Sequence, residues 1–284
     1  MPRKILEEKL LRLLTEDIGQ GDVTVAAIVY SKLKAEAEVV AKESGVVAGI
    51  EETVVLAESL GLKVEAHVTD GVKIKKGQIL IHVSGDARTV LSAERTMLNL
   101  LSRMSGIATS ASHLSEKLLK AGSKTRIAAT RKTALGLSIF DKKAVTIGGG
   151  DSHRFHLDDM VLIKDNHLAI VGGIKDAVRK AKQVASFSKK IEVEVTRGED
   201  VIVAAKAGAD AIMLDNFSPK QVKEAVKMLE KAGLRERVLL EVSGGITEET
   251  LLAYASTDVD ILSMGALTHS AKALDVSLEI TKKS

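Results

Sequence analysis

The sequence contains no cysteine and only a few prolines and aromatic residues. The absence of cysteine excludes disulfides and thiolate zinc sites, and it is compatible with a reducing cytoplasm. The only prolines are Pro2 and Pro219 and no low-complexity tract occurs, so we expect no disordered linker. Aromatic residues make up 2% of the chain, which is too few for the base-stacking platforms of single-strand nucleic-acid binding proteins.

Long apolar runs are also missing. No stretch reaches ~18 uncharged apolar residues, and the N-terminal segment is charged and amphipathic, so we expect neither a membrane span nor a signal peptide. The net charge is only +3 and no basic block contains aromatics, so we expect no nucleic-acid partner. The 284 residues are 45% hydrophobic and 28% charged, which predicts a soluble globular protein with one large or two modest domains. Because cysteine is also absent, we expect a cytoplasmic protein.

The first part of the chain has a different pattern from the rest. After a predicted N-terminal helix, alternating residues at 34–49 and 64–86 predict short strands separated by glycine turns. This β-rich module is similar to a carrier domain, but it lacks a convincing lysine at a hairpin tip, so we favour a structural role. Apolar residues at helical spacing predict helix over 88–121, and Gly106 marks a possible break between two helices.

From residue 125 onward, short apolar strands alternate with helical segments. The predicted strands are 126–130, 160–164, 191–195, 211–215, 238–242 and 261–265. Such alternation predicts right-handed βαβ crossovers and a parallel sheet. Six units favour an α/β fold with an open, incomplete β/α barrel.

Reactive residues lie at or just after the carboxyl end of nearly every predicted strand. These residues are Arg131, Lys164, Glu194, Asp215, Ser243 and Gly265. In barrel enzymes this end builds the active site. The polar stretch 148–167 is therefore expected to form one wall of an active site rather than an ordinary solvated loop.

A cationic group at this end consists of Arg131, Lys132, His153, Arg154 and Lys164. Arginine binds carboxylates and phosphates in a bidentate manner and lysine acts as a point charge, so the group predicts a substrate with several negative charges. The alternative is a set of ion pairs with nearby aspartates. Lys142 and Lys143, in contrast, are expected in a solvated turn.

An acidic group consists of Glu194 and Asp215, and strand alternation places Glu192 on the same face as Glu194. Carboxylates beside bound phosphates hold Mg²⁺ or accept hydrogen bonds from sugar hydroxyls. Ion pairing with the cationic group is the alternative interpretation.

Glycines follow the last two strands in the segments 241–246 and 263–267. They are expected to expose backbone N–H groups at a helix N-terminus, which suits phosphate, whereas tight turns are the alternative. No Walker loop, dinucleotide fingerprint or nucleophile elbow occurs. His153 and His156 have metal-ligand spacing but no evident third ligand.

Several motifs together resemble the quinolinate phosphoribosyltransferase family, also called nicotinate-nucleotide pyrophosphorylase (carboxylating). They are ERTMLNLLSRMSGIAT, ATRKTALGL, GGGDSHRFHLDDMVLIKDNH, IEVEV, IMLDNFSP, EVSGGI and MGALTHSA. The resemblance extends from about residue 16 to the C-terminus.

The resemblance implies an N-terminal α/β sandwich-like domain and a C-terminal open barrel. We assign residues 1–105 to the first, 106–268 to the second and 269–284 to a segment that returns to the N-terminal domain. It also implies a homodimer, or a larger oligomer of dimers, in which Arg95 reaches into the neighbouring subunit's site.

The implied reaction converts quinolinate and phosphoribosyl pyrophosphate, with Mg²⁺, into nicotinate mononucleotide, pyrophosphate and CO₂ for NAD synthesis. We assign catalytic roles to Lys132, Lys164, Glu194 and Asp215, and we expect Glu194 and Asp215 to hold the metal together with the diphosphate. The predicted substrate-binding residues are Arg95, Thr130, Arg131, Lys132, His153, Arg154, Lys164, Glu194, Asp215, Ser243, Gly244, Gly245, Met264, Gly265, Ala266 and His269.

Two other functions share part of this pattern. A molybdenum-transport-associated paralogue, or another barrel enzyme acting on a sugar phosphate, needs the phosphate loops but not a dicarboxylate site. A non-catalytic sensor of phosphoribosyl pyrophosphate binds the ligand without turnover.

Overall fold

The computed structural model describes residues 1–284 and divides them into two compact units. The first unit comprises Met1–Ser112 together with Ala271–Ser284, and the second comprises His113–Ser270. No helix is long and apolar enough to cross a membrane.

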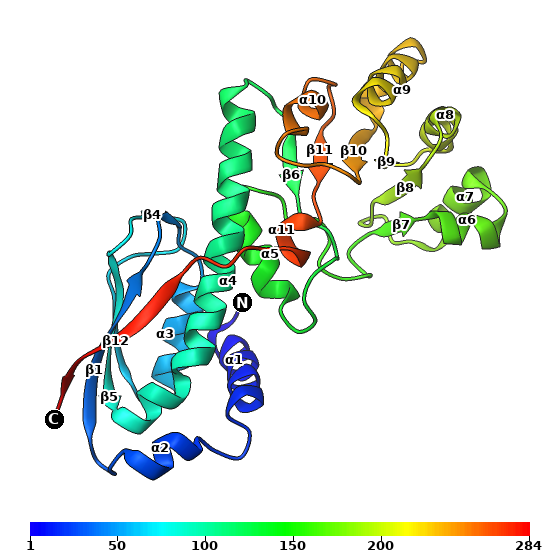
Figure 1. The fold of residues 1–284 in the computed structure, drawn as a ribbon. Coiled ribbons are helices and arrows are strands. Elements are labelled where there is room, and N and C mark those ends of the chain that lie inside the picture. The colour runs from blue at the N-terminus through cyan, green and yellow to red at the C-terminus, as the bar shows by residue number, and fades with distance from the viewer. The chain divides into compact units, whose positions relative to one another are not determined.

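The first unit is built on a four-stranded antiparallel sheet in the order β12-β1-β5-β3. Its strands are β1 (Lys34–Ala41), β3 (Lys63–Ala66), β5 (Ile79–Asp86) and β12 (Val276–Lys283), and a separate pair is formed by β2 (Gly45–Val46) and β4 (Lys73–Ile74). The last strand, coloured red in Figure 1, pairs with the first, coloured blue. The C-terminal segment thus belongs to the N-terminal unit, because β12 adds an edge strand to its sheet.

Helices provide the core against one face of this sheet. They are α1 (Arg3–Ile18), α2 (Val23–Ile28), α3 (Ile50–Ser59) and the first part of α4 (Ala87–Lys120). Alternate strand residues such as Val39, Ile81 and Val83 are fully buried, so one face of the sheet meets the helices and the other does not.

The predicted helix break at Gly106 is wrong, because α4 is continuous from Ala87 to Lys120. The glycine has a packing role instead. A Cβ atom at Gly106 would lie 1.9 Å from the carbonyl oxygen of Lys272 and 3.0 Å from the Cα of Ala273. Only glycine lets the C-terminal segment approach the helix this closely.

The second unit is a six-stranded parallel sheet in the order β6-β11-β10-β9-β8-β7. The strands are β6 (Arg126–Ala128), β7 (Val161–Ile163), β8 (Ile191–Val195), β9 (Ala211–Asp215), β10 (Leu239–Ser243) and β11 (Ile261–Ser263). Each coincides with a predicted strand, and their parallel pairing confirms the open α/β barrel.

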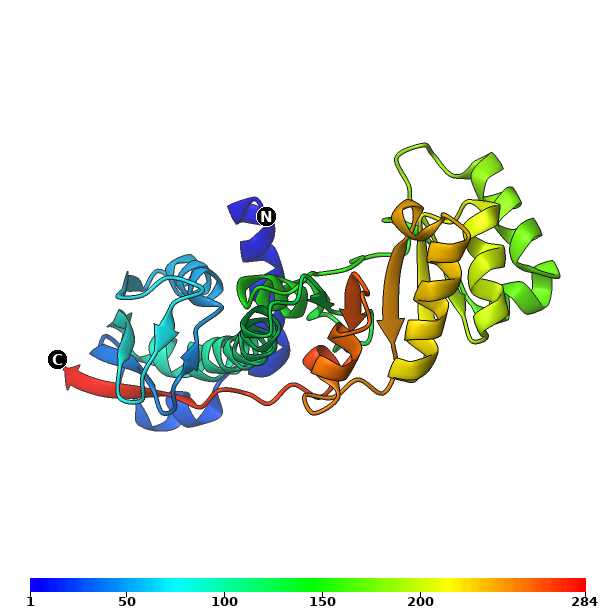
Figure 2. The ribbon, with the colours of Figure 1, turned by 90° about the horizontal axis from the view of Figure 1, so that it is seen from above.

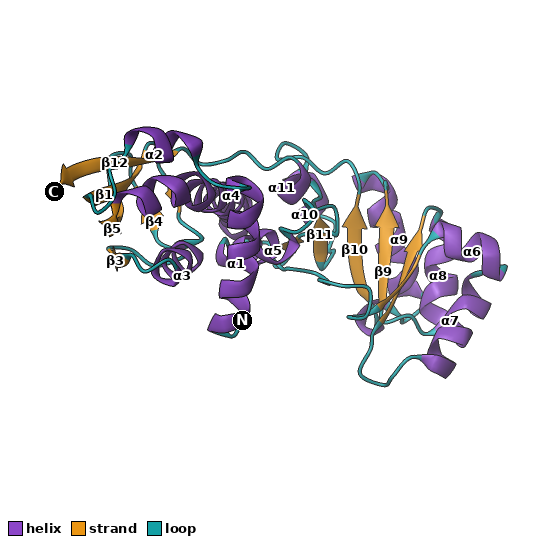
Figure 3. Cartoon of the chain, turned by 90° about the horizontal axis from the view of Figure 1, so that it is seen from below, coloured by secondary structure: helices purple, strands orange, loops and turns teal.

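Helices follow the strands and cover the sheet. They are α5 (Ser138–Ile147), α6 (Asp165–Val171), α7 (Ile174–Val184), α8 (Gly198–Ala207), α9 (Pro219–Lys231), α10 (Leu251–Ala255) and α11 (Ala266–His269), with a short 3₁₀ turn at Arg235–Arg237. Helices α7, α8 and α9 pack side by side along one side of the strands (Figures 2 and 3).

The sheet is open between β6 and β7, which are consecutive in sequence but lie at opposite edges. Residues 129–160 connect these two edges, so this segment crosses the opening of the barrel. A parallel bridge between Ala128 and Asp151 fastens the middle of the segment to β6. This topology brings the polar stretch 148–160 to the carboxyl ends of the strands.

Candidate active site

A cavity of about 450 Å³ lies at the carboxyl ends of the parallel strands. Its lining residues come from every strand of the sheet or from the loop that follows it. They are Ala129, Thr130, Arg131, Lys132, His153, Arg154, Leu162, Lys164, Glu194, Met213, Asp215, Asn216, Glu241, Ser243, Gly244 and Ser263. The cavity therefore brings together ten of the predicted site residues, separated by more than a hundred positions in the sequence.

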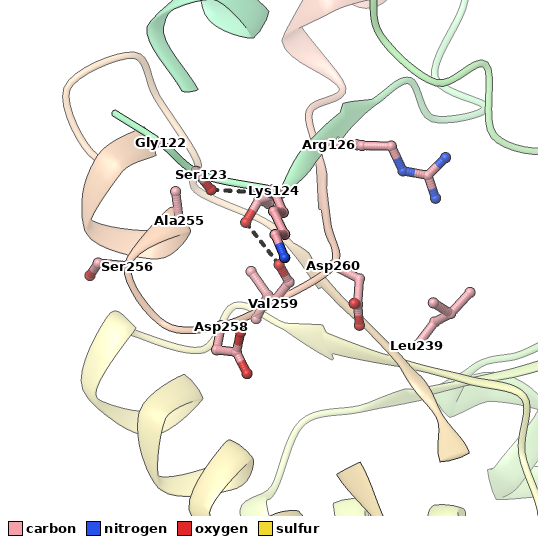
Figure 4. Close-up of a pocket in the computed structure, with 11 residues that line it drawn as sticks. Gly122, Ser123, Lys124, Arg126, Leu239, Ala255, Ser256, Asp258, Val259 and Asp260 are labelled. Carbon is pink, nitrogen blue, oxygen red and sulfur yellow. Dashed lines mark hydrogen bonds between the residues drawn. The ribbon is translucent and has the colours of Figure 1, made fainter. Parts of the chain in front are cut away.

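A second cavity, of about 550 Å³, lies at the amino ends of β6, β10 and β11 (Figure 4). Its aspartate Asp260 accepts hydrogen bonds from the backbone N–H of Leu240 at 2.7 Å and from Arg235 at 3.1 Å. Thr125 donates to the carbonyl oxygen of Val259. These polar groups fasten loops to strands, as is typical of the stabilising end of a barrel, so we place the chemistry at the carboxyl ends.

Lys164 and Glu194 form an ion pair at the end of adjacent strands β7 and β8. The Lys164 ammonium donates to Glu194 Oε2 across 2.6 Å. The glutamate side chain is 10% exposed and that of the lysine 43% exposed. The buried carboxylate is thus held by a cation that faces the cavity.

Asp215 lies at the end of β9, beside a close contact between Asn216 and Gly244. Asn216 donates from its side chain to Asp215 at 2.8 Å and from its backbone to the carbonyl oxygen of Ser243 at 2.8 Å. Gly244 has a φ of 92°, and a Cβ atom there would lie 2.1 Å from Asn216 Oδ1. Glycine is required at this position because the loop after β10 contacts the loop after β9.

Both ring nitrogens of His153 have hydrogen-bond partners. Nδ1 accepts a hydrogen bond from the backbone N–H of Arg154 at 2.8 Å, and Nε2 lies 3.0 Å from Glu241 Oε2 and 3.7 Å from Glu192 Oε2. The histidine has a φ of 51°, an uncommon conformation outside glycine. The accepting Nδ1 places the proton of a neutral ring on Nε2, from which it is donated to Glu241.

Glu192 and Glu241 form a buried carboxyl pair beneath His153. They are 1% and 2% exposed, respectively. Burial, followed by repulsion from Glu241, raises the pKa of Glu192 to about 9. Ser263 donates a hydrogen bond to the other carboxyl oxygen of Glu241. At neutral pH the pair therefore retains a proton, as expected for two carboxyl groups that share a dry site.

Lys142 was predicted in a solvated turn, and this prediction is wrong. It lies in α5, its side chain is fully buried, and its ammonium donates to the carbonyl oxygens of Ser152 and Arg154. The Nζ atom also lies 5.5 Å from the centre of the Phe155 ring. Burial lowers the pKa of Lys142 to about 8. This lysine determines the backbone path of the loop that carries His153 and Arg154.

The cations of the cavity repel one another. Burial and the neighbouring Arg131 both lower the pKa of the Arg154 guanidinium from its ordinary value. The backbone of Lys132 is held at both of its polar groups. Its N–H donates to the Thr130 hydroxyl at 3.1 Å, and its carbonyl oxygen accepts from the Thr268 hydroxyl at 2.7 Å. An anion in the cavity relieves this repulsion, so the arrangement favours a substrate with negative charges.

Six predicted substrate-binding residues lie outside the cavity lining: Arg95, Gly245, Met264, Gly265, Ala266 and His269. A Cβ atom on Gly265 would lie 3.2 Å from Lys132 Cδ and 3.0 Å from the His269 ring, so Gly265 lies next to both side chains. Arg95 belongs to the first unit, where its exposed guanidinium lies 3.6 Å from Glu94.

The glycines after β10 were expected at a helix N-terminus, but no helix begins directly after them. Gly244 and Gly245 have φ values of 92° and 64°, but the next helix, α10, begins only at Leu251. The intervening turn is closed by hydrogen bonds between Thr247 and Thr250. Gly265, in contrast, directly precedes α11.

The sequence interpretation missed three polar residues of the cavity lining, Asn216, Glu241 and Ser263. It also missed Lys142, which lies outside the lining and holds the backbone of Ser152 and Arg154. Glu241 could have been identified from the sequence, because an acidic residue inside a predicted apolar strand is unusual. His153 and His156 do not form one metal site. His153 contacts Glu192 and Glu241, whereas His156 lies beside Asp158 and Asp159.

Comparison with protein-family models gives matches over nearly the whole chain. Residues 22–105 match the model described as quinolinate phosphoribosyl transferase, N-terminal domain, and residues 107–279 match the model of the C-terminal domain.

Relatives from distant organisms are similar over almost their full lengths. A protein named probable nicotinate-nucleotide pyrophosphorylase [carboxylating] from Methanocaldococcus jannaschii is 47% identical, covering 96% of each chain. The Homo sapiens nicotinate-nucleotide pyrophosphorylase [carboxylating] is 38% identical over 91% of this chain and 86% of its own.

Solved structures agree with these matches. The nicotinate-nucleotide pyrophosphorylase of Francisella tularensis superposes with a TM-score of 0.89 at 36% identity, covering 99% of this chain and 98% of that one. NadC from Streptococcus pyogenes gives a TM-score of 0.89 at 34% identity, covering 100% and 98%.

Proposed function

The chain belongs to the quinolinate phosphoribosyltransferase family, and from this premise we propose that it converts quinolinate and phosphoribosyl pyrophosphate into nicotinate mononucleotide, pyrophosphate and CO₂. This reaction is the step that supplies the pyridine nucleotide in de novo NAD synthesis. The single observation that carries the proposal is the cavity at the carboxyl ends of the strands, which combines Arg131, Lys132, Arg154 and Lys164 with three acidic residues.

Quinolinate is a dicarboxylate, and we assign its two carboxylates to Arg131, Arg154 and Lys164. Arginine can pair with a carboxylate through two parallel hydrogen bonds, which fixes the plane of the pyridine ring. His153 has both nitrogens engaged with Arg154 and Glu241, so in this arrangement it orients Arg154. The sequence prediction that His153 contacts the substrate stays a prediction.

Phosphoribosyl pyrophosphate is a polyanion, and we place it against Lys132 and the loops that contain Ser243, Gly244, Gly245 and the segment 264–269. Glu194 and Asp215 face its ribose and diphosphate. The absence of a side chain at Gly244 makes room for Asn216, which keeps the loop after β10 against the loop after β9. Within the segment 264–269, Gly265 lies next to the side chains of Lys132 and His269.

A divalent metal suits this donor set. Glu194 and Asp215 end the adjacent strands β8 and β9, and oxygen ligands from one or two carboxylates plus substrate phosphates are what Mg²⁺ prefers. We propose that Glu194 and Asp215 hold Mg²⁺ together with the diphosphate. When bound, the metal neutralises charge on the leaving pyrophosphate.

The chemistry follows from positioning and electrostatics. The pyridine nitrogen of quinolinate attacks the anomeric carbon of the ribose, and the bond to pyrophosphate breaks. Positive charge develops on the ribose in this step, and the carboxylates of Glu194 and Asp215 stabilise it. Lys164 holds the Glu194 side chain in place through the 2.6 Å ion pair.

Loss of CO₂ then uses the electron-withdrawing pyridinium nitrogen. The bond between the ring and the 2-carboxylate breaks, its electron pair stays on the ring carbon, and that carbon takes up a proton. Lys132 and Lys164 are the two ammonium groups of the cavity that can supply it. The products are CO₂ and the nucleotide.

We further propose a homodimer in which Arg95 of each subunit reaches the site of its partner. Arg95 is exposed and pairs only with the adjacent Glu94, so its guanidinium is available for such a role.

The test is release of labelled CO₂ from carboxyl-labelled quinolinate by the purified protein with Mg²⁺. Release that requires phosphoribosyl pyrophosphate supports transfer and decarboxylation together. Binding of phosphoribosyl pyrophosphate without release would reject the proposal and favour the sensor. Turnover with another nitrogen heterocycle, but not with quinolinate, would favour the paralogue.

A further inference from the structure

The outer face of the N-terminal sheet carries a row of histidine and glutamate side chains. Glu38 on β1 and Glu65 on β3 both lie directly opposite His82 on β5, which lies between them. His67 follows β3 and stays joined to β5, because its backbone N–H donates to the carbonyl oxygen of Leu80 at 2.9 Å. Four possible metal or hydrogen-bonding partners thus gather on three neighbouring strands.

This row lies on the side of the sheet away from the helices. The neighbouring strand residues Val39, Ile81 and Val83 are fully buried, and alternation turns Glu38 and His82 to the opposite face. The His82 side chain is 44% exposed and that of Glu38 is 24% exposed. The imidazoles are therefore accessible to an ion from solvent.

The two imidazoles meet through their nitrogens. His67 Nε2 lies 3.1 Å from His82 Nδ1, and the ring planes are nearly perpendicular at 85°. One ligand atom from each of Glu65, His67 and His82 lies within 4.8 Å of the other two. Two nitrogens bound to one tetrahedral zinc, with Zn–N of about 2.0–2.1 Å, are separated by about 3.3 Å. The observed spacing is close to this separation.

Glu38 fixes the form of His82 that a metal requires. His82 Nε2 lies 2.7 Å from Glu38 Oε1, so in a neutral ring Nε2 carries the proton and Nδ1 presents its lone pair toward His67. Histidine ligands of metals commonly donate their other N–H to a carboxylate in this way. Without a metal, the lone pair of Nδ1 accepts the N–H of His67.

We propose that Glu65, His67 and His82 form a zinc-binding site on the N-terminal sheet, with Glu38 as the residue that orients His82. The ligand atoms are His67 Nε2, His82 Nδ1 and a carboxylate oxygen of Glu65, and a water molecule completes the tetrahedron. On binding, the proton of His67 Nε2 leaves that nitrogen, and its neutral ring is protonated on Nδ1 instead.

The ligand chemistry distinguishes this site from the magnesium site proposed in the cavity. Imidazole nitrogen binds zinc and other borderline metals, whereas magnesium prefers oxygen ligands alone. The bound zinc would fasten the edge strand β3 to the central strand β5. Since only the folded sheet brings the ligands together, zinc would stabilise the folded protein in proportion to its affinity and concentration.

The experiment is calorimetric titration of zinc chloride into untagged protein that has been stripped with a chelator, in a large excess of Mg²⁺. We expect one zinc per chain from this site. The variants His67→Gln and His82→Gln should each weaken zinc binding at least about 10-fold, and Glu38→Gln about 10-fold. His113→Gln is the matched control, because His113 is an exposed histidine that pairs with Glu248.

Labelled CO₂ release and the melting temperature without zinc verify that each variant is folded. The proposal would be overturned if the wild-type protein did not bind zinc. It would also be overturned if the double variant His67→Gln/His82→Gln bound zinc as tightly as the wild-type protein. A loss of binding in His113→Gln equal to that in His82→Gln would also overturn it.

Discussion

The buried ammonium of Lys142 donates a hydrogen bond to the carbonyl oxygen of Arg154 across 2.8 Å. This contact joins helix α5 to the backbone of the loop that carries His153 and Arg154. Lys142 itself does not line the cavity. Its effect on the reaction is therefore expected to be indirect, through the position of Arg154.

The variant Lys142→Met should lower kcat/KM for quinolinate by about 100-fold, because small displacements of binding groups have effects of this size. Burial lowers the pKa of Lys142 to about 8, below its ordinary value of 10.5. The charged lysine therefore costs stability below pH 8, and this cost is relieved as the pH rises from about 8 to about 10.5. Steady-state kinetics and urea unfolding across this range measure the two effects.

Lys180→Met on the exposed face of α7 is the control and should change neither quantity. A Lys142→Met variant with wild-type kinetics for quinolinate would show that the loop keeps its shape without this lysine.

Arg154→Ala should reduce kcat/KM for quinolinate by an amount equivalent to roughly 2–5 kcal/mol of transition-state stabilisation, as for other lost charge pairs. The reason is that Arg154 is half-buried in the lining of the cavity, where we assign its guanidinium to a carboxylate of quinolinate. The effect should be measured with both substrates varied. Arg179→Ala, on the surface of α7, serves as the control, and near wild-type kinetics for Arg154→Ala would remove this residue from the site.

Glu192→Gln should flatten the dependence of stability on pH. The pKa of Glu192 is raised from 4.5 to about 9, so between these values the folded protein holds a proton that the unfolded chain releases. The contribution of this proton to the free energy of unfolding is complete below about pH 4.5, and it is lost as the pH rises through about 9. The amide remains neutral and should increase the free energy of unfolding at pH 8 by about 1–3 kcal/mol.

Denaturant unfolding at several pH values measures this change, and Glu224→Gln on the exposed face of α9 is the control. If Glu192→Gln has the same slope of stability against pH as the wild-type protein, the buried pair does not hold the proton.

Glu194→Gln and Asp215→Asn should each raise the Mg²⁺ concentration needed for half-maximal CO₂ release and lower kcat. Each substitution replaces a carboxylate oxygen that we place against the ribose and the diphosphate, and Glu194→Gln also removes the carboxylate partner of Lys164. Losses of about 10–100-fold in kcat/KM are expected for a carboxylate next to a metal. Asp176→Asn, in a surface pair with Arg179, is the control, and an unchanged Mg²⁺ requirement in both variants would contradict the metal assignment.

Mixing two inactive variants tests the proposed dimer. Arg95→Ala and Arg154→Ala should each be inactive, but a mixed dimer contains one site with both arginines intact. Unfolding and refolding the two variants together should then restore roughly one quarter of wild-type activity, given random pairing in a twofold dimer. No restoration, with mixed dimers demonstrated by mass, would mean that Arg95 serves its own subunit or no site at all.

Much of the fold was readable from the sequence because the signals are local. The apolar strands β6 to β11 alternate with helices at spacings that leave only a parallel sheet, and each predicted strand is present. The carboxyl ends of parallel strands necessarily share one edge. For this reason ten of the predicted residues could be assigned to one cavity without knowledge of their distances.

Local signals failed where a distant segment determines a residue's environment. Gly106 looked like a helix break because glycine is a weak helix former, but the C-terminal segment packs against it and requires the missing side chain. Lys142 looked solvated because lysine is rarely buried, but two carbonyl oxygens ten and twelve residues away satisfy its ammonium.

The sequence by itself therefore determined the order of strands and helices, the end of the sheet that carries the chemistry, and the sign of the charges there. Periodicity and strand direction are properties of neighbouring residues, so they are visible without coordinates. Only the tertiary structure decided that Glu192 and Glu241 share a dry site beneath His153, and that Glu38, His67 and His82 meet on the outer sheet. These groups come from different strands, and their protonation and ligand chemistry depend on distances that exist only after the strands have paired.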